Sequence, residues 1–248
     1  PITLVICKNC NLVQLGNNFD LKYLYGPDYG YRTGINKTML DHVKSVVKYL
    51  SKKAKIKKNE LVLDIASNDG SLLKYYSSGI IKCGIDPILN KYINEYKDVN
   101  YKISSFFSAN KINIYVKNKK FKIITALSVF YDAADPNKFL RDIKKLLHDK
   151  GVCLLEFADL ASIVKYKMFD TICHEHLEYY STKVIMKLCQ ENGLRVFDIK
   201  KNKINGASKQ YYICHNISHF KDNSNVITNE IKIENKMKLA ETKTYKKF

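Results

Sequence analysis

The sequence predicts an α/β fold, with a mostly parallel seven-stranded sheet and helices on both of its faces. Short apolar segments recur from residue 61 onward, and stretches with apolar residues at helical spacing separate them. Strands that alternate with helices are typical of a parallel sheet flanked by helices. The last two apolar segments have only a short polar link between them, which predicts an antiparallel addition at one edge of the sheet.

The expected strands are short apolar runs that begin with LVLDIA. FKIITALSVF gives the strongest strand signal, because it is long and rich in residues that favour buried strands. In chain order, the expected strands cover residues 61–66, 80–86, 101–106, 121–130, 152–158, 194–200 and 209–216.

Helices are expected before and between these strands. The helix at about 38–57 carries apolar residues at helical spacing, and GSLLKYY is expected to continue the first strand as a helix. Another helix starts at Pro136, since proline is favoured in the first helical turn, and is expected to end at Gly151. The helix STKVIMKLCQENG is closed by Gly193.

The net charge of +18 comes from 42 Lys+Arg against 24 Asp+Glu. Only Arg32, Arg141 and Arg195 are arginines, and arginine is the residue that proteins use for bidentate phosphate and base recognition. A soluble enzyme with a lysine-rich surface is therefore favoured over a nucleic-acid-binding protein, although an acidic substrate would still be attracted. No apolar run has the length of a membrane span, so no membrane partner is expected.

Cysteine usage indicates a reducing compartment. The chain has 7 cysteines, an odd number, and Cys83 and Cys153 lie inside expected core strands. This pattern is not a disulfide framework, and it predicts a cytoplasmic protein.

The first strand leads into a polar turn with small residues from Asp64 to Ser71. A cofactor that lies across the carboxyl ends of parallel strands needs such a close backbone approach, together with helix N-terminal amides near its anionic group. Asp86, at the end of the second strand, is placed to accept hydrogen bonds from ribose hydroxyls. GxGxxG is absent, which argues against a dinucleotide and fits a cofactor that has a methionine carboxylate. From the residues alone, an ordinary polar loop stays equally open.

The segment TICHEHLEYY contains two of the chain's 6 histidines. Cys173, His174 and His176 are all metal-ligand types, but the spacing is not HExxH. A histidine beside a carboxylate can also act as an acid or a base near neutral pH. Histidines that only complete a loop are the third possibility, and the residues by themselves leave all of these open.

Several of these segments together resemble the sugar C-methyltransferase family of class I S-adenosylmethionine-dependent methyltransferases. The resemblance is carried by VLDIASNDGSLL, SVFYDAADPNKFLRDIKKLL, GVCLLEF, FDTICHEHLEYYS and GLRVFDIKKNKINGASKQYYI. It covers about residues 1–245 in order. HEHLEYYS is the specific part, whereas the first segment is similar to that of many methyltransferases. The resemblance implies a Rossmann-like class I methyltransferase fold.

The resemblance implies that S-adenosylmethionine binds at the turn after the first strand. Ala66 stands where the family usually has glycine, and one added methyl group is a small change. The expected cofactor-binding residues are Asp64, Ala66, Ser67, Asn68, Gly70, Asp86, Phe106, Leu127 and Ser128.

The resemblance also implies C-methylation of a nucleotide-linked keto-deoxysugar. His176 matches the family's base, Glu175 is expected to orient it, and His174 is expected to contact the enolate oxygen or the sugar. The alternatives are O-methylation of a sugar and a non-catalytic module that binds a nucleotide-sugar or a partner protein. The expected substrate-binding residues are Tyr131, Tyr179, Tyr180, Asn205 and Ser208.

Two positions depart from the family pattern. Cys173 stands where many members have an active-site tyrosine, and Gln210 stands where members often have an arginine. If that arginine holds a charged part of the substrate, Lys209 is the residue expected to replace it here.

The first residues resemble half of the family's small zinc domain, which uses two CxxC pairs. Cys7 and Cys10 form the one pair present, so structural zinc is expected only where a second pair is supplied. The first residue is not methionine, and the family's C-terminal domain is missing, so the chain is expected to be a fragment.

Four segments are therefore expected along the chain. Residues 1–20 are the remnant of a zinc-binding segment, and 21–57 form an aromatic loop and a helical lead-in. Residues 58–220 form the methyltransferase domain, and 221–248 form a lysine-rich helical tail that leads to the absent domain.

Overall fold

The structure is a computed structural model that describes residues 2–17, 20–26 and 28–246. The predicted segments 1–20, 21–57 and 221–248 therefore each include residues outside the described ranges. These residues are Pro1, Asn18, Phe19, Pro27, Lys247 and Phe248.

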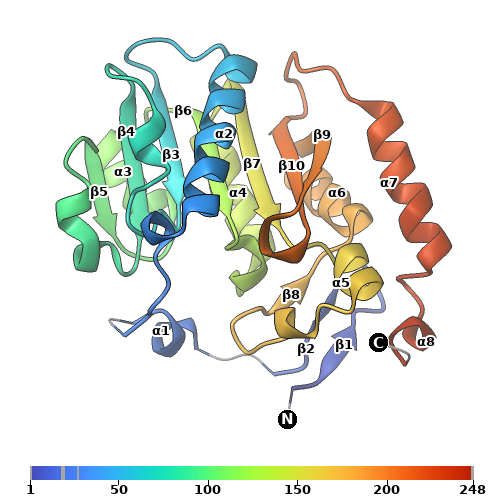
Figure 1. Ribbon diagram of the computed structural model, residues 1–248. Helices are drawn as coiled ribbons and strands as arrows, with labels where there is room; N and C mark the ends of the chain where they lie inside the picture. Colours follow the sequence, from blue (N-terminus) through green and yellow to red (C-terminus); the bar gives the residue numbers. More distant parts are fainter. Residues whose placement is uncertain (1, 18–19, 27, 247–248) are drawn as a thin grey trace.

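The core of the fold is the predicted seven-stranded sheet (Figure 1), in the order β5-β4-β3-β6-β7-β10-β9. β3, β4, β5, β6 and β7 are parallel to one another, and β10 is antiparallel to both β7 and β9. The fold prediction is confirmed, and the antiparallel strand lies between β7 and the edge strand β9. The strands are β3 (Leu61–Ile65), β4 (Ile81–Asp86), β5 (Tyr101–Ser104), β6 (Phe121–Leu127), β7 (Leu147–Phe157), β9 (Leu194–Asn202) and β10 (Ser208–His215).

The helix after β6 ends earlier than predicted. α4 (Pro136–Leu146) is capped by Asp135, whose side chain accepts a hydrogen bond from the Lys138 amide. The prediction that this helix extends to Gly151 is wrong, because Leu147 already pairs with Phe121 of β6 in the sheet. The residues expected to form the last helical turn are therefore the first residues of β7.

The helix predicted for GSLLKYY is wrong as well. Between β3 and β4 the chain forms one turn of 3-10 helix, η2 (Leu73–Tyr75). Gly70 has φ +74, and a Cβ added there would lie 3.1 Å from the Tyr96 ring. This left-handed position redirects the chain before a helix can start, so the turn presents loop amides in place of a helix N-terminus.

Helices cover both faces of the sheet (Figure 1). α2 (Lys37–Ala54) lies over one face, and its buried residues share a cluster with η2 and η3 (Leu89–Glu95). The other face is covered by α3 (Ala109–Val116), α4, α6 (Thr182–Glu191) and part of α7 (Ser224–Met237). Gly193 follows α6 with φ +71, as predicted for a residue that closes a helix.

The N-terminal residues form a hairpin that sequence reasoning did not predict. β1 (Leu4–Ile6) pairs with β2 (Val13–Leu15), and β2 pairs with β8 (Glu178–Tyr179). β8 lies within the histidine segment TICHEHLEYY, just after its two histidines. The hairpin therefore supports that segment, and α5 (Leu160–Tyr166) and residues near α8 (Thr242–Tyr245) pack against the same small sheet (Figure 1).

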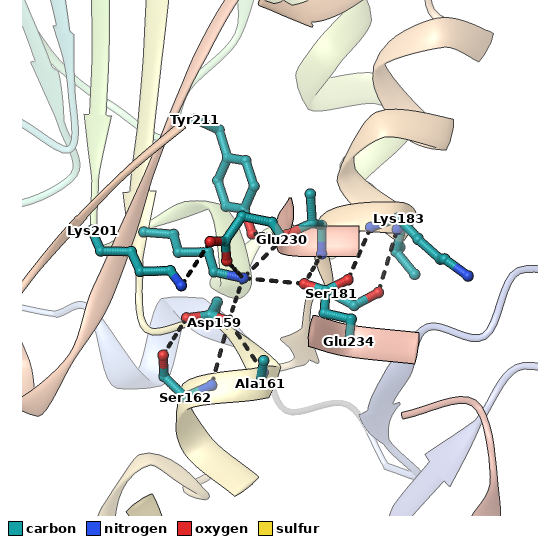
Figure 2. A network of polar contacts seen from close by, with 12 residues as sticks. Asp159, Ala161, Ser162, Ser181, Lys183, Lys201, Tyr211, Glu230 and Glu234 are labelled. Carbon is teal, nitrogen blue, oxygen red and sulfur yellow. Dashed lines mark hydrogen bonds and ion pairs between the residues drawn. The ribbon is translucent and has the colours of Figure 1, made fainter. Parts of the chain in front are cut away.

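A buried ionic cluster fastens α5 and α7 to the sheet. Lys209 of β10 is 1% exposed, and its ammonium lies 2.9 Å from Asp159, 3.0 Å from Glu230 and 3.1 Å from Glu234. Figure 2 shows these three carboxylates converging, with Lys201 on Glu230 from outside. Burial alone would lower the pKa of Lys209, but Tyr211 and the carboxylates raise it overall. Lys209 is fully engaged here, so it does not replace the arginine of the family pattern.

No helix among the described residues has the length and apolar character required to cross a membrane.

Candidate active site

A cavity of about 850 Å³ opens at the carboxyl ends of β3, β4 and β6, where an α/β sheet usually binds its ligand. Its volume lies toward the upper end of the usual range for ligand sites, so two small ligands could occupy it together. Most of the predicted site residues line it: Asp64, Ala66, Ser67, Asn68, Asp86, Phe106, Leu127, Ser128, Tyr131, Glu175, His176 and Asn205.

A second set of predicted residues does not line this cavity: Gly70, His174, Tyr179, Tyr180 and Ser208. Tyr179 belongs to β8 and pairs with Val13, and Tyr180 stacks on Phe130 inside the core. The Ser208 hydroxyl donates to the carbonyl of Ile204. Tyr179, Tyr180 and Ser208 are therefore buried in packing, whereas His174 is exposed.

Backbone strain is concentrated in the cavity wall. Ala66, Asn68, Ser128 and Asn205 all have φ between 50 and 55 and all line the cavity. The left-handed region costs a non-glycine residue about 1–2 kcal/mol and is often found at functional sites. The position of Ala66 therefore favours glycine, which agrees with the glycine of the family pattern.

Two buried aspartates hold the turn after β3. The Thr125 hydroxyl donates to Asp64 Oδ1 at 2.6 Å, and burial raises the pKa of Asp64 to about 7. Asp86 accepts from the amides of Asn68 and Ile88, at 2.9 and 2.8 Å. Burial raises the pKa of Asp86 in spite of these bonds. Each Asp86 oxygen keeps a further lone pair that could accept a ligand hydroxyl.

His176 is held in one tautomer. Its Nδ1 lies 2.7 Å from the carbonyl oxygen of Thr171, the last residue of η5 (Phe169–Thr171). A carbonyl only accepts, so Nδ1 carries the hydrogen and Nε2 keeps its lone pair. Burial lowers the pKa of His176, which leaves the ring neutral at neutral pH. The Tyr131 ring lies 4.1 Å from the His176 ring, centroid to centroid.

A backbone hydrogen bond joins the histidine segment to the turn that follows β6. The Leu177 amide donates to the Tyr131 carbonyl at 2.9 Å. Cys173 is not part of the lining, and its thiol lies 3.6 Å from Glu175 Oε2. Burial raises the pKa of Cys173, so the thiol stays protonated. Glu175, which lines the cavity, is therefore the hydrogen-bond partner of the Cys173 thiol.

An aromatic segment that precedes α2 forms another wall, and its site residues were not predicted. Tyr25, Tyr29 and Tyr31 line the cavity. The Thr33 amide donates to the side chain of Asn68, whose amide group donates to the Tyr31 carbonyl. The available sequence signal was the set of tyrosines and glycines in LKYLYGPDYGYRTG, but only the fold shows which strand turn they cover.

A buried histidine–carboxylate pair was also missed. His42 Nε2 of α2 lies 2.6 Å from Glu156 of β7, and the Gln210 side chain donates to the other Glu156 oxygen. Gln210 thus bonds within the sheet. Neither His42, Glu156 nor Gln210 lines the cavity.

The lining is acidic although the whole chain carries +18. Carboxylates outnumber lysines on it, and Lys22 and Lys138 are the lysines that take part. Lys138 is itself paired with Asp142 at 2.9 Å. The wall therefore favours a ligand that carries positive charge.

Cys7 and Cys10 lie in the turn between β1 and β2, away from this cavity. The described residues contain no group of three or more His, Cys, Asp or Glu side chains that could hold a metal ion. A complete zinc site is therefore not formed by this part of the chain.

Known proteins share this fold and part of this sequence. A family model described as a methyltransferase domain matches residues 35–199. The C-methyltransferase NovU of Streptomyces niveus is 25% identical over 210 residues, which are 84% of this chain and 50% of NovU. The chain thus spans about half the length of that curated relative.

Solved structures agree with the fold. An S-adenosylmethionine-dependent methyltransferase from Clostridium acetobutylicum has a TM-score of 0.56 at 12% identity, covering 71% of this chain and 92% of the other. Magnesium protoporphyrin IX methyltransferase from Synechocystis has a TM-score of 0.53 at 16% identity, covering 75% and 90%. Because the family match spans more than half of the sequence, the chain belongs to the methyltransferase-domain family and has the fold of S-adenosylmethionine-dependent methyltransferases.

Proposed function

We propose that this domain uses S-adenosylmethionine to methylate the carbon next to the ketone of a nucleotide-linked keto-deoxysugar, with His176 as the base. The observation that carries the proposal is a single cavity lined both by the turn after β3 and by His176 and Glu175. NovU, which is described as a C-methyltransferase, supports carbon as the methyl acceptor.

The cavity suits this cofactor in charge and shape. An acidic lining favours a sulfonium cation, and the small residues Ala66 and Ser67 allow close approach to the backbone. Asp86 is proposed to face the ribose, and Phe106 and Leu127 are proposed to flank the adenine. When bound, S-adenosylmethionine supplies an electrophilic methyl group. The remaining chemistry falls to residues of this chain.

His176 is proposed to remove the proton next to the carbonyl. Nδ1 is committed to the Thr171 carbonyl, which leaves Nε2 as the atom that accepts the proton. The positive charge that then forms on the ring is stabilised by Glu175, which raises the pKa of His176 against the effect of burial. Tyr131 keeps the ring plane fixed by its contact with the imidazole.

The test is direct. The full-length protein is incubated with isotopically labelled S-adenosylmethionine and a panel of nucleotide-linked keto-deoxysugars, and the methyl is located by NMR. We expect a methyl on carbon, and activity that is lost as pH falls below the ordinary histidine value of 6.5. A methyl on oxygen contradicts C-methylation, and an absence of cofactor binding by calorimetry contradicts the enzyme assignment.

A further inference from the structure

Asp132 is a buried carboxyl group that the mechanism above leaves unused. It ends η4 (Phe130–Asp132), just after β6, and is 4% exposed. The Tyr25 hydroxyl donates to its Oδ2 at 2.7 Å across 107 positions of sequence. Its Oδ1 has no hydrogen-bond partner among the described residues, although both Tyr25 and Asp132 line the cavity. A buried unpaired carboxylate oxygen is unfavourable, so this atom calls for an explanation.

The groups around Asp132 favour its neutral form. Burial is the main cause that raises its pKa well above the ordinary value, and the nearby carboxylates Glu175 and Glu178 raise it further. The hydrogen bond from Tyr25 acts in the other direction but does not reverse the shift. Tyr29 and Tyr131 also lie close to it, since Asp132 raises the pKa of both phenols, and burial keeps them neutral. Burial and these neighbouring carboxylates therefore favour the protonated carboxylic acid form of Asp132 over the carboxylate.

A carboxylic acid has one hydrogen to donate. Because Oδ2 accepts from Tyr25, that hydrogen belongs on Oδ1, for which the described residues supply no acceptor. Oδ1 is itself buried, whereas Tyr25 is only partly buried and lies on the cavity wall. The pair can also exchange roles, so that Asp132 donates to the Tyr25 hydroxyl, which then donates into the cavity.

We propose that Tyr25 and Asp132 act as a hydrogen-bond-donating pair that holds the carbonyl oxygen of the substrate, with Tyr25 as the contacting residue and Asp132 positioning and polarising it. The proposal rests on the proposed function, because it supplies the donor which that reaction requires. A neutral carboxylic acid and a tyrosine are known together as a device for holding an enolate oxygen. Cys173 does not line the cavity, so it is not the donor.

The reaction balances with this pair in place. His176 Nε2 takes the proton from the carbon next to the carbonyl, and the C–H electron pair moves into a carbon–carbon double bond. The carbonyl electrons move onto oxygen, which is held by the Tyr25 hydrogen. The double-bond electrons then form the bond to the methyl group, the C–S electron pair stays on sulfur, and the carbonyl re-forms. The removed proton leaves from His176 to solvent.

Proton exchange at the substrate carbon tests the pair before any methyl is transferred. The full chain is incubated in D₂O with S-adenosylhomocysteine and the same panel of nucleotide-linked keto-deoxysugars, and deuterium uptake is followed by NMR. Tyr25→Phe and Asp132→Asn are each expected to slow exchange about 10²-fold, as for loss of one oxyanion donor. Tyr23→Phe is the matched control, since Tyr23 lies on α1 (Leu21–Leu24), the helix that Tyr25 caps, and is 89% exposed.

The pH dependence of deuterium exchange distinguishes a role of Asp132 in the reaction from a merely structural role. Wild type is expected to lose exchange as pH rises and Asp132 ionises, and Asp132→Asn is expected to lack that loss because asparagine does not titrate. Exchange within about threefold of wild type in both variants, or a high-pH loss retained in Asp132→Asn, overturns the pair and leaves C-methylation standing. If wild type neither exchanges nor methylates any sugar of the panel, the proposed function fails and the pair fails with it.

Discussion

The Lys209 cluster and the cavity both bury ionisable groups, but they differ in whether those groups have partners within the protein. In the cluster, each carboxylate around Lys209 meets a cation, and β10, α5 and α7 are joined by these pairs (Figure 2). In the cavity, Asp132 Oδ1 has no hydrogen-bond partner among the described residues, and the bond from His176 to the Thr171 carbonyl uses only Nδ1. Buried groups that satisfy one another hold a fold together, whereas groups left unsatisfied are available to a ligand.

The largest expected effect is a loss of methyl transfer on mutation of the cavity. His176→Ala is expected to lower methyl transfer by about 10²–10⁴-fold, because the group that is proposed to accept the proton is lost. Cofactor affinity and thermal stability should stay close to wild type. Labelled-methyl transfer and calorimetry measure the two quantities. His219→Ala, an exposed histidine after β10, is the control. A lost cofactor affinity in His176→Ala would instead give His176 a structural role.

The next effect is a loss of folding stability on mutation of the Lys209 cluster. Lys209→Met is expected to reduce the free energy of unfolding by about 3–5 kcal/mol, because three buried carboxylates lose their shared cation. Denaturant unfolding followed by circular dichroism gives the value. Lys201→Met removes a half-exposed partner of Glu230 and should reduce stability by only about 0.5–1 kcal/mol. Equal losses in the two variants would contradict the difference between the buried and the exposed pair.

The last effect concerns Glu178, a buried carboxyl group near Asp132 that accepts a hydrogen bond from Tyr180 at 2.8 Å. Burial raises its pKa from 4.5 to about 8. The folded chain therefore holds this proton more tightly than the unfolded chain, and stability falls as pH rises from 4.5 to 8.

Glu178→Gln removes this titration and can still accept the bond from Tyr180. The melting temperature of the variant minus that of wild type should therefore be larger at about pH 9 than at about pH 5. The expected increase is about 2–4 °C for each kcal/mol of unfolding free energy that wild type loses over this range. Thermal unfolding at the two pH values measures it. A constant difference between the variant and wild type at both values would show that Glu178 does not change its ionisation on folding.

The sequence predicted the elements that depend on local pattern. The strands at β3, β4, β6 and β7 were recognised because buried parallel strands are continuous apolar runs. α2, α4 and α6 followed from helical spacing, and Pro136 and Gly193 marked ends that the structure bears out. The helix for GSLLKYY failed because its local pattern says nothing of the close contact between Gly70 and Tyr96.

The site was only partly accessible from sequence, for a related reason. Residues at strand ends, such as Asp64 and Asp86, were found because parallel strands bring their carboxyl ends to one edge. Tyr25 and Asp132 were missed, because a hydrogen bond over 107 positions leaves no local signal. Tyr179 and Tyr180 were expected at the site and are packed in the interior, since pairing of β8 with the N-terminal hairpin decides where they face.

By itself, the sequence determined the strands of the large sheet and most of its helices, and it indicated that the turn after β3 and the histidine segment lie at one sheet edge. Apolar periodicity and residue type are local properties, so they can be evaluated along the chain. The tertiary structure decided which polar groups find partners: Lys209 meets its carboxylates, and Asp132 Oδ1 meets none among the described residues. Hydrogen bonding and desolvation depend on what surrounds a group in space, and only the folded chain brings those surroundings together.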